Sequence, residues 1–242
     1  MKNLKDYISE SILDGSKRVS TNDVRNEIKQ FLIDNYSNPN KFKISRKPNN
    51  EGYYEVDCSK LHHIEIINKN ITSLTNNLFK FVRVAGHFDC RYCEKLTSLE
   101  GAPKEVGGHF ICQRCKSLTS LEGAPKEVGR HFDCDQCDNL TSLKGAPEKV
   151  EGSFSCRYCK SLTSLEGAPK EVDGDFLCWS CSNLKSLKGA PEKVGEHFNC
   201  SHCNNLTSLK GAPKEIGGQF DCSDCAKLKS LEGAPKATEV IH

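Results

Sequence analysis

The chain has 242 residues, with 34 basic and 32 acidic side chains and a formal net charge of +2. This balance provides no long-range field for nucleic acid or an acidic membrane, and no run of about 18 apolar residues is present to span a bilayer. The apolar fraction is 36%, below the roughly 45–50% of an average globular domain, so a thick core is not expected. The N-terminus lacks the apolar run of a secretory signal peptide, which predicts a reducing compartment and free thiols.

Two amphipathic helices are predicted near the N-terminus, at residues 3–13 and 22–36. Apolar side chains share one helical face in each, at Leu4, Tyr7, Ile8 and Ile12 and at Val24, Ile28, Phe31 and Leu32. Ser20 or Thr21 is a suitable N-cap for the second helix. We therefore expect residues 1–52 to form a helical cap with a short hairpin or linker behind it.

Residues 42–85 contain a predicted hairpin and weaker versions of the later repeat. Phe42–Ser45 and Tyr53–Val56 are predicted to pair as a hairpin, because Pro-Asn-Asn lies between them. Residues 53–85 carry weaker versions of the later repeat, beginning with the spaced apolar residues Val56 and Cys58. These are interpreted as degenerate first repeats.

From residue 86 to residue 242 a 22-residue unit recurs seven times. The unit reads G-x-F-x-C-x-x-C-x-x-L-[TK]-S-L-[EK]-G-A-P-[KE]-[EK]-[VI]. Such a period is typical of a solenoid, since one unit can bury its apolar face only against its neighbours. Alternation at Phe110-x-Cys112 predicts one short parallel strand per coil, with an extended or 3₁₀ return segment after the proline. The expected fold is an α+β solenoid dominated by β structure, capped by helices at its N-terminal end.

The spacing within the unit resembles that of cysteine-containing leucine-rich repeats. Cys115 stands where asparagine usually follows the strand, and Leu118 and Leu121 turn the chain inward again. The resemblance implies a leucine-rich-repeat solenoid over the repeated region.

Charged residues alternate in sign from one repeat to the next. The clearest series is Glu122, Lys144, Glu166 and Lys188, and the two residues after each proline follow the same rule from Pro125 to Pro213. The first coils break it, with Glu100 beside Glu122 and Lys104 beside Lys126. In coils about 4.8 Å apart the alternating residues would form ladders of opposite charge, each exposed pair contributing only about 0–1 kcal/mol. Recent duplication of a two-coil unit explains the alternation equally well.

Fourteen of the 15 cysteines form seven Cys-x-x-Cys pairs, and Cys58 stands alone. Such pairs are common zinc half-sites, so a structural or sensory zinc site remains an alternative. The interpretation we favour makes both cysteine columns buried small side chains whose S–H groups donate to nearby carbonyls, because one member of each pair falls at a strand position. The candidate zinc ligands are Cys90, Cys93, Cys112, Cys115, Cys134, Cys137, Cys156, Cys159, Cys178, Cys181, Cys200, Cys203, Cys222 and Cys225.

A second column precedes the strand phenylalanine and holds His87, His109, His131 and His197. It could bind metal, yet Ser153, Asp175 and Gln219 occupy the same position, which favours a solvated edge. The sequence contains no Gly-rich phosphate loop, no HExxH and no G-x-S-x-G. We therefore predict no enzymatic activity, no catalytic residue and no cofactor.

Function is expected where the repeat varies, between Phe and Cys and between the paired cysteines. Trp, Tyr and Arg most often anchor protein interfaces, and several occur at these positions. The candidate partner-binding residues are Arg91, Tyr92, Ile111, Arg114, Arg157, Tyr158, Leu177 and Trp179. The sequence thus predicts a protein partner, with its strongest anchor at Leu177 and Trp179; drift of an unconstrained surface is the alternative.

The repeat register LTSLEGAPKEVGG-x-F-x-C and the preceding ITSLTNNLFKF resemble leucine-rich-repeat proteins of large tailed bacteriophages. The resemblance implies a module that binds a host or phage protein in the cytoplasm of an infected bacterium. Asparagine is frequent at the ladder position of those relatives, so the Cys-x-x-Cys form departs from the family.

The first residues, MKNLKDYISES, resemble a capsid-targeting leader of phage head proteins. Such leaders are cut after glutamate in an Ile/Leu-x-Glu motif, here Ile8-Ser9-Glu10. This second resemblance implies a mature chain that starts at Ser11 and is packaged in the virion.

Overall fold

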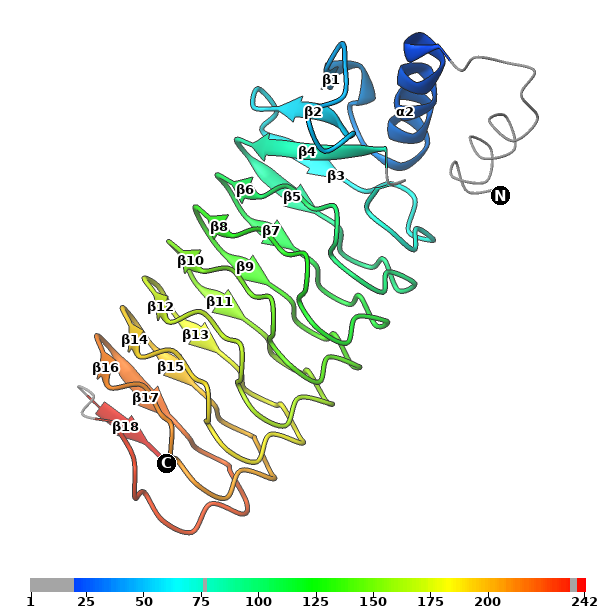
Figure 1. Cartoon of the computed structure of the whole chain (residues 1–242). Coiled ribbons are helices and arrows are strands. Elements are labelled where there is room, and N and C mark those ends of the chain that lie inside the picture. Colours follow the sequence, from blue (N-terminus) through cyan, green and yellow to red (C-terminus); the bar gives the residue numbers. More distant parts are fainter. Residues whose placement is uncertain (1–19, 76–77, 236–238) are drawn as a thin grey trace.

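The computed structural model describes residues 20–75, 78–235 and 239–242. These residues form a stack of short coils, a β-solenoid whose turns follow one another along a single axis from the N-terminal to the C-terminal end (Figure 1). Two nine-stranded sheets run along the solenoid, and neighbouring strands within each sheet are parallel except for the first pair. The expected repeat solenoid is confirmed.

The first sheet, which we call the valine sheet, contains the short strands that follow the prolines. In sheet order its strands are β1 (Lys43–Ile44), β2 (Tyr54–Cys58), β4 (Phe79–Val84), β6 (Glu105–Val106), β8 (Glu127–Val128), β10 (Lys149–Val150), β12 (Glu171–Val172), β14 (Lys193–Val194) and β16 (Glu215–Ile216).

The second sheet, the phenylalanine sheet, contains the strands that lead to the seven Cys-x-x-Cys turns, with one further strand at each end. Its strands are β3 (His63–Glu65), β5 (His87–Asp89), β7 (Phe110–Ile111), β9 (Phe132–Asp133), β11 (Phe154–Ser155), β13 (Phe176–Leu177), β15 (Phe198–Asn199), β17 (Gln219–Asp221) and β18 (Glu239–Ile241).

The prediction of one strand per coil was therefore wrong, because each coil contributes a strand to both sheets. The return segment after the proline pairs with the same segment of the previous turn, as the Gly129 N–H donates to the Val106 carbonyl at 2.8 Å. A two-residue strand such as β8 is too short to show the alternation of buried and exposed side chains by which strands are recognised in a sequence.

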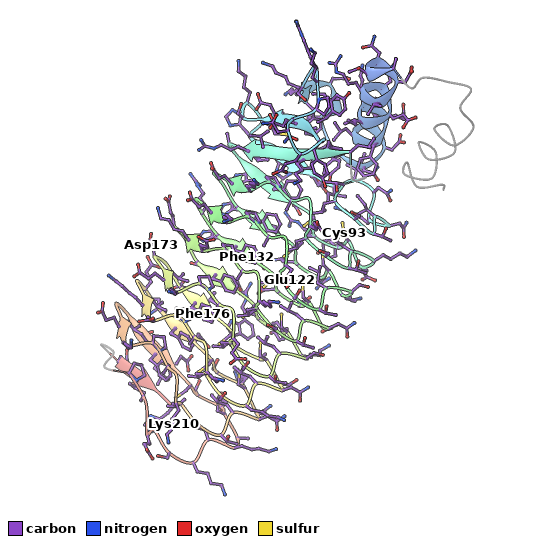
Figure 2. The ribbon with its side chains drawn as sticks, in the orientation of Figure 1. Cys93, Glu122, Phe132, Asp173, Phe176 and Lys210 are labelled. Atoms are coloured by element: carbon purple, nitrogen blue, oxygen red, sulfur yellow. The ribbon has the colours of Figure 1, made fainter. Side chains whose placement is uncertain are left out.

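A column of stacked phenylalanines fills the interior. Phe88 to Phe220 recur once per turn, and each is fully buried. Successive rings are nearly parallel, with centroids 5.1 Å apart for Phe132 and Phe154 and 5.5 Å for Phe88 and Phe110. Figure 2 shows Phe132 and Phe176 inside the coil. Each aromatic pair adds roughly 0.5–1.5 kcal/mol beyond the burial of its area, so the column favours the 22-residue register over any slipped one.

At the N-terminal end of the solenoid lies α2 (Thr21–Asn35) (Figure 1). Its start is fixed by a capping box, in which the Asp23 N–H donates to the Ser20 hydroxyl while the Asp23 carboxylate accepts from the Ser20 N–H. Ile28 and Leu32 are buried in the same core as the first turns. The predicted helix at 22–36 and its N-cap are confirmed.

The remaining predictions for this end have mixed outcomes. The expected hairpin is confirmed, since β1 and β2 pair antiparallel with Ile44 opposite Val56; a 3₁₀ turn at Pro39–Lys41 precedes it. The predicted helix at 3–13 and the motif Ile8-Ser9-Glu10 lie outside the described residues. Within the described part of the chain, no helix combines the length and apolarity that crossing a membrane requires.

The predicted charge ladders are confirmed between several turns. Lys144 contacts Glu122 at 2.8 Å, and Lys188 contacts Glu166 at 2.7 Å. These side chains are largely exposed, so each pair contributes little stability and mainly disfavours shifted registers.

Candidate functional site

Each Cys-x-x-Cys segment forms a sharp turn at the C-terminal end of a strand of the phenylalanine sheet. The sheet ladder continues past the strand, because the Cys112 N–H donates to the Asp133 carbonyl and the Arg114 N–H donates to the Asp135 carbonyl, both at 2.8 Å. The residue before the second cysteine then takes a positive φ of 53–63° in all seven repeats. These left-handed residues are Tyr92, Arg114, Gln136, Tyr158, Ser180, His202 and Asp224.

The two cysteine columns face the interior. All fifteen cysteines are buried free thiols. The second thiol of a pair donates to the carbonyl oxygen of the first cysteine one turn earlier, from Cys115 to Cys90 at 3.1 Å through Cys225 to Cys200 at 3.2 Å. The intermediate members of this ladder are the thiols of Cys137, Cys159, Cys181 and Cys203. The thiols thus satisfy core carbonyls, as the favoured interpretation expects.

The same burial opposes thiolate chemistry. Burial raises the pKa of the Cys112 and Cys178 thiols well above its ordinary value, and it raises the pKa of Cys93 to about 12. A metal ligand or nucleophile is the thiolate, so ligation here requires the loss of a proton that the fold holds firmly. Among the described residues, no group of three or more His, Cys, Asp or Glu is arranged to hold a metal ion.

The histidine column has a role that sequence reasoning missed. The His109 N–H donates to Nδ1 of His87 at 2.8 Å, and the His131 N–H donates to Nδ1 of His109 at 3.2 Å. The imidazole rings of His87 and His109 stack with centroids 4.5 Å apart. Every other residue type found in this column also carries an acceptor, and Ser153 and Asp175 accept the equivalent bond. A shared acceptor among otherwise different side chains was the available signal.

Two of the three predicted arginines on the turns, Arg91 and Arg157, are held by buried carboxylates. Arg91 pairs with Asp89, whose side chain is only 2% exposed, with Nε to Oδ2 at 2.7 Å. Arg157 binds Asp135 of the previous turn in the same way, at 2.6 Å. These pairs fix the direction of both guanidinium groups.

Three of the candidate residues form one cluster. The rings of Tyr158 and Trp179 meet edge to face with centroids 4.6 Å apart, and the guanidinium of Arg157 lies 5.4 Å from the Trp179 ring centre. Leu177, predicted to be exposed beside Trp179, is half-buried on β13, as is Trp179. Ile111 is half-buried on β7 and lies three repeat periods away from Leu177, so it belongs to no common patch with it.

A second cluster surrounds Arg114. Its guanidinium lies 5.3 Å from the ring centre of Tyr92, and its Nε donates to Oε1 of Gln136. A hollow of about 350 Å³ opens here between Tyr92 and Tyr158. It is also lined by residues that sequence reasoning did not single out, which are Glu94, Lys116, Gln136, Asp138 and Lys160. The alternating charge directly after the second cysteine was the signal for four of them.

We call the two residues between each cysteine pair, together with the residue that follows the pair, the turn edge. The fold and the turn edge together define the chain as a parallel β-solenoid repeat protein. Searches against protein-family models, curated proteins and solved structures found no match. The functional argument therefore rests on the geometry of the turn edge.

Proposed function

We propose that the chain is a non-enzymatic binding module of the leucine-rich-repeat type that holds a protein partner along the turn edge. The observation that supports this proposal is the row of side chains kept at left-handed positions. An L-residue in the left-handed region is disfavoured by roughly 1–2 kcal/mol, and glycine escapes most of that cost.

The same chain uses glycine at its other left-handed corner. Gly123, Gly145 and Gly167 take φ values of 88–91° in successive turns, where a Cβ would collide with the backbone of the preceding turn. At the turn edge the corresponding residues point outward and are never glycine. Strained side chains that persist where glycine would serve the fold are typical of functional positions.

The anchor of the proposed interface is the cluster of Arg157, Tyr158 and Trp179. Its members are already held in place, because Asp135 fixes Arg157 and the two aromatic rings support each other. Pre-organised aromatic and arginine side chains lose little entropy on binding, so they contribute most to affinity. We further propose that α2 caps the N-terminal end, which leaves the turn edge as the surface available to a partner.

The bacteriophage resemblance adds a setting to this proposal. It supports a role in the cytoplasm of an infected bacterium, bound to a host or phage protein. A cleaved capsid-targeting leader at residues 1–10 is tested by mass spectrometry of virion-derived protein: a chain starting at Ser11 supports the leader, and an intact Met1 or Lys2 argues against it.

The decisive experiment separates binding from folding. Wild type, Tyr158→Gly with Trp179→Ala, and Ser180→Gly are immobilised, and proteins retained from an infected-cell lysate are quantified by mass spectrometry. Tyr158→Gly removes an anchor and relieves strain, whereas Ser180→Gly relieves the equivalent strain without removing an aromatic ring. We expect a partner that wild type and Ser180→Gly retain and the double variant loses, with all three folded by circular dichroism. The same proteins on all three columns would contradict the proposal.

A further inference from the structure

The hollow around Arg114 has a simple charge arrangement. Its rim carries two ion pairs, Lys116 with Glu94 at 2.6 Å and Lys160 with Asp138 at 3.1 Å. Each pair joins neighbouring turns and leaves the rim electrically balanced. Among the described residues that line the hollow, Arg114 is the one charged side chain outside these two ion pairs.

Arg114 differs from the other two arginines of the turn edge. Arg91 and Arg157 each bind a buried carboxylate, whereas no ion pair with a carboxylate is found for Arg114 among the described residues. The two groups in contact with its guanidinium are uncharged, the amide of Gln136 and the ring of Tyr92. The guanidinium therefore keeps its charge and its Nη donors available toward the hollow.

The uncharged polar groups here can also donate hydrogen bonds. Gln136 accepts from Arg114 through Oε1, which leaves its Nε2 amide as a donor. The hydroxyls of Tyr92 and Tyr158, side chains 44% and 38% exposed, lie at the two ends of the hollow and can also donate. A ligand that matches this set must accept hydrogen bonds and carry one negative charge.

We infer that the hollow between Tyr92 and Tyr158 receives the carboxylate of a single aspartate or glutamate on an exposed segment of the protein partner, with Arg114 as its ion-pair partner. The inference rests on the proposed function and gives that surface a recognition rule. A planar guanidinium binds a carboxylate through two parallel hydrogen bonds and also carries the opposite charge. An amide side chain has no charge and cannot replace it.

The charges at the rim of the hollow favour a partner segment with one acidic residue among uncharged ones. Glu94 and Asp138 stand on either side of Arg114, so a run of acidic residues or a phosphate backbone would bring like charges against them. The tyrosines at both ends offer apolar ring surface to the residues that flank the acid.

The test compares three forms of the folded full chain. Arg114→Gln removes the charge and places at this left-handed position a residue that Gln136 already shows to be accepted there. Arg83→Gln is the matched control, an exposed arginine of β4 in the valine sheet. An mRNA-displayed library of random 12-residue peptides is selected on each form in parallel, and affinities of recovered peptides are measured by fluorescence anisotropy.

We expect peptides with one central Asp or Glu to be enriched on wild type and on Arg83→Gln but not on Arg114→Gln. Replacing that acid by its amide should weaken binding to wild type by about tenfold or more and leave binding to Arg114→Gln unchanged. Equal peptide profiles on all forms, no enrichment on wild type, or tighter binding of a 12-nucleotide single-stranded DNA would overturn the inference. If the protein partner still binds Arg114→Gln but no longer binds the Tyr158→Gly, Trp179→Ala variant, the proposed turn-edge interface is supported. Only the carboxylate site at Arg114 is then rejected.

Discussion

The thiol of Cys137 donates a hydrogen bond to the carbonyl oxygen of Cys112 at 3.2 Å, and so links two successive turns inside the core. Cys137→Ala removes this donor and leaves a small cavity. We expect it to lower the free energy of unfolding by about 1–3 kcal/mol in urea denaturation, because a buried carbonyl loses its partner.

The last repeat supplies a matched control. Cys225 makes the equivalent bond to Cys200, but it is 8% exposed and lies in the turn at the C-terminal end of the stack. Cys225→Ala should cost clearly less than Cys137→Ala, since water can reach the vacated site. Equal losses in the two variants would show that the thiol ladder contributes nothing specific to the interior turns.

Thiol reactivity offers a second test. Burial raises the pKa of interior thiols such as Cys112 and Cys134 well above the ordinary value, and it raises the pKa of Cys222 to about 11. At pH 8 the native protein should therefore react slowly with an aromatic disulfide reagent, and all 15 thiols should react after denaturation. Peptide mapping of partly labelled protein should find Cys222 and Cys225 modified first. Rapid labelling of interior cysteines such as Cys134 would contradict the buried ladder.

The protons that the buried cysteine thiols retain also oppose metal binding. A zinc site would need several thiolates, whereas the second thiol of each pair from Cys115 onward donates a hydrogen bond to a carbonyl in the previous turn. Protein purified without chelator should contain no stoichiometric zinc by elemental analysis, and chelator treatment should leave its thermal unfolding midpoint unchanged. A fixed number of zinc ions per chain, or a fall in that midpoint, would favour the zinc alternative.

Much of this architecture could be read from the sequence because the repeat states each constraint seven times. The burial of Phe110, the inward cysteines and the charge pairs all follow from residues recurring at one period. The valine sheet could not be read in this way. Strands such as β8 and β10 contain two residues, and their pairing depends on the backbone of the neighbouring turn more than on side-chain alternation.

The candidate site was predicted by residue type but not by geometry. Arg91 and Arg157 directly follow the first cysteine of their pairs and bind buried carboxylates, whereas Arg114 directly precedes the second cysteine and does not. The two carboxylates come from different turns, since Asp89 lies in the same turn as Arg91 and Asp135 reaches Arg157 from the previous turn. Positive φ at a tyrosine or arginine has no signature in a sequence.

Alanine substitutions at two glycines distinguish the cost of a steric collision from the cost of backbone strain. Gly167 has φ +91°, and a Cβ there would lie 2.4 Å from the Lys144 backbone nitrogen. Gly52 has a similar φ of +83°, but nothing lies within 4 Å of its hypothetical Cβ. Gly52→Ala should cost about 1–2 kcal/mol from strain alone, and Gly167→Ala clearly more, measured by thermal and urea unfolding. Equal costs would mean that the turns adjust freely to the added methyl group.

The stacked histidines make stability depend on pH. Burial, with the neighbouring histidines, lowers the pKa of His87 and of His109 below the ordinary value of 6.5. Between the folded and unfolded pKa values the unfolded chain binds more protons, so stability is complete above about pH 6.5 and is lost as the pH falls through the folded values. The structural cause is direct: a protonated Nδ1 can no longer accept the N–H of His109 or His131.

Glutamine separates this titration from the loss of an acceptor. Gln219 occupies the same column in the last repeat, so His87→Gln with His109→Gln offers amide oxygens in place of both imidazoles. We expect the double variant to match wild type in urea unfolding at pH 8 and to lose less stability between pH 7 and pH 5. A variant that follows the wild-type pH profile would show that the histidine column is not the source of the acid sensitivity. A variant already destabilised at pH 8 would instead show that ring stacking, at 4.5 Å between centroids, matters more than the hydrogen bonds.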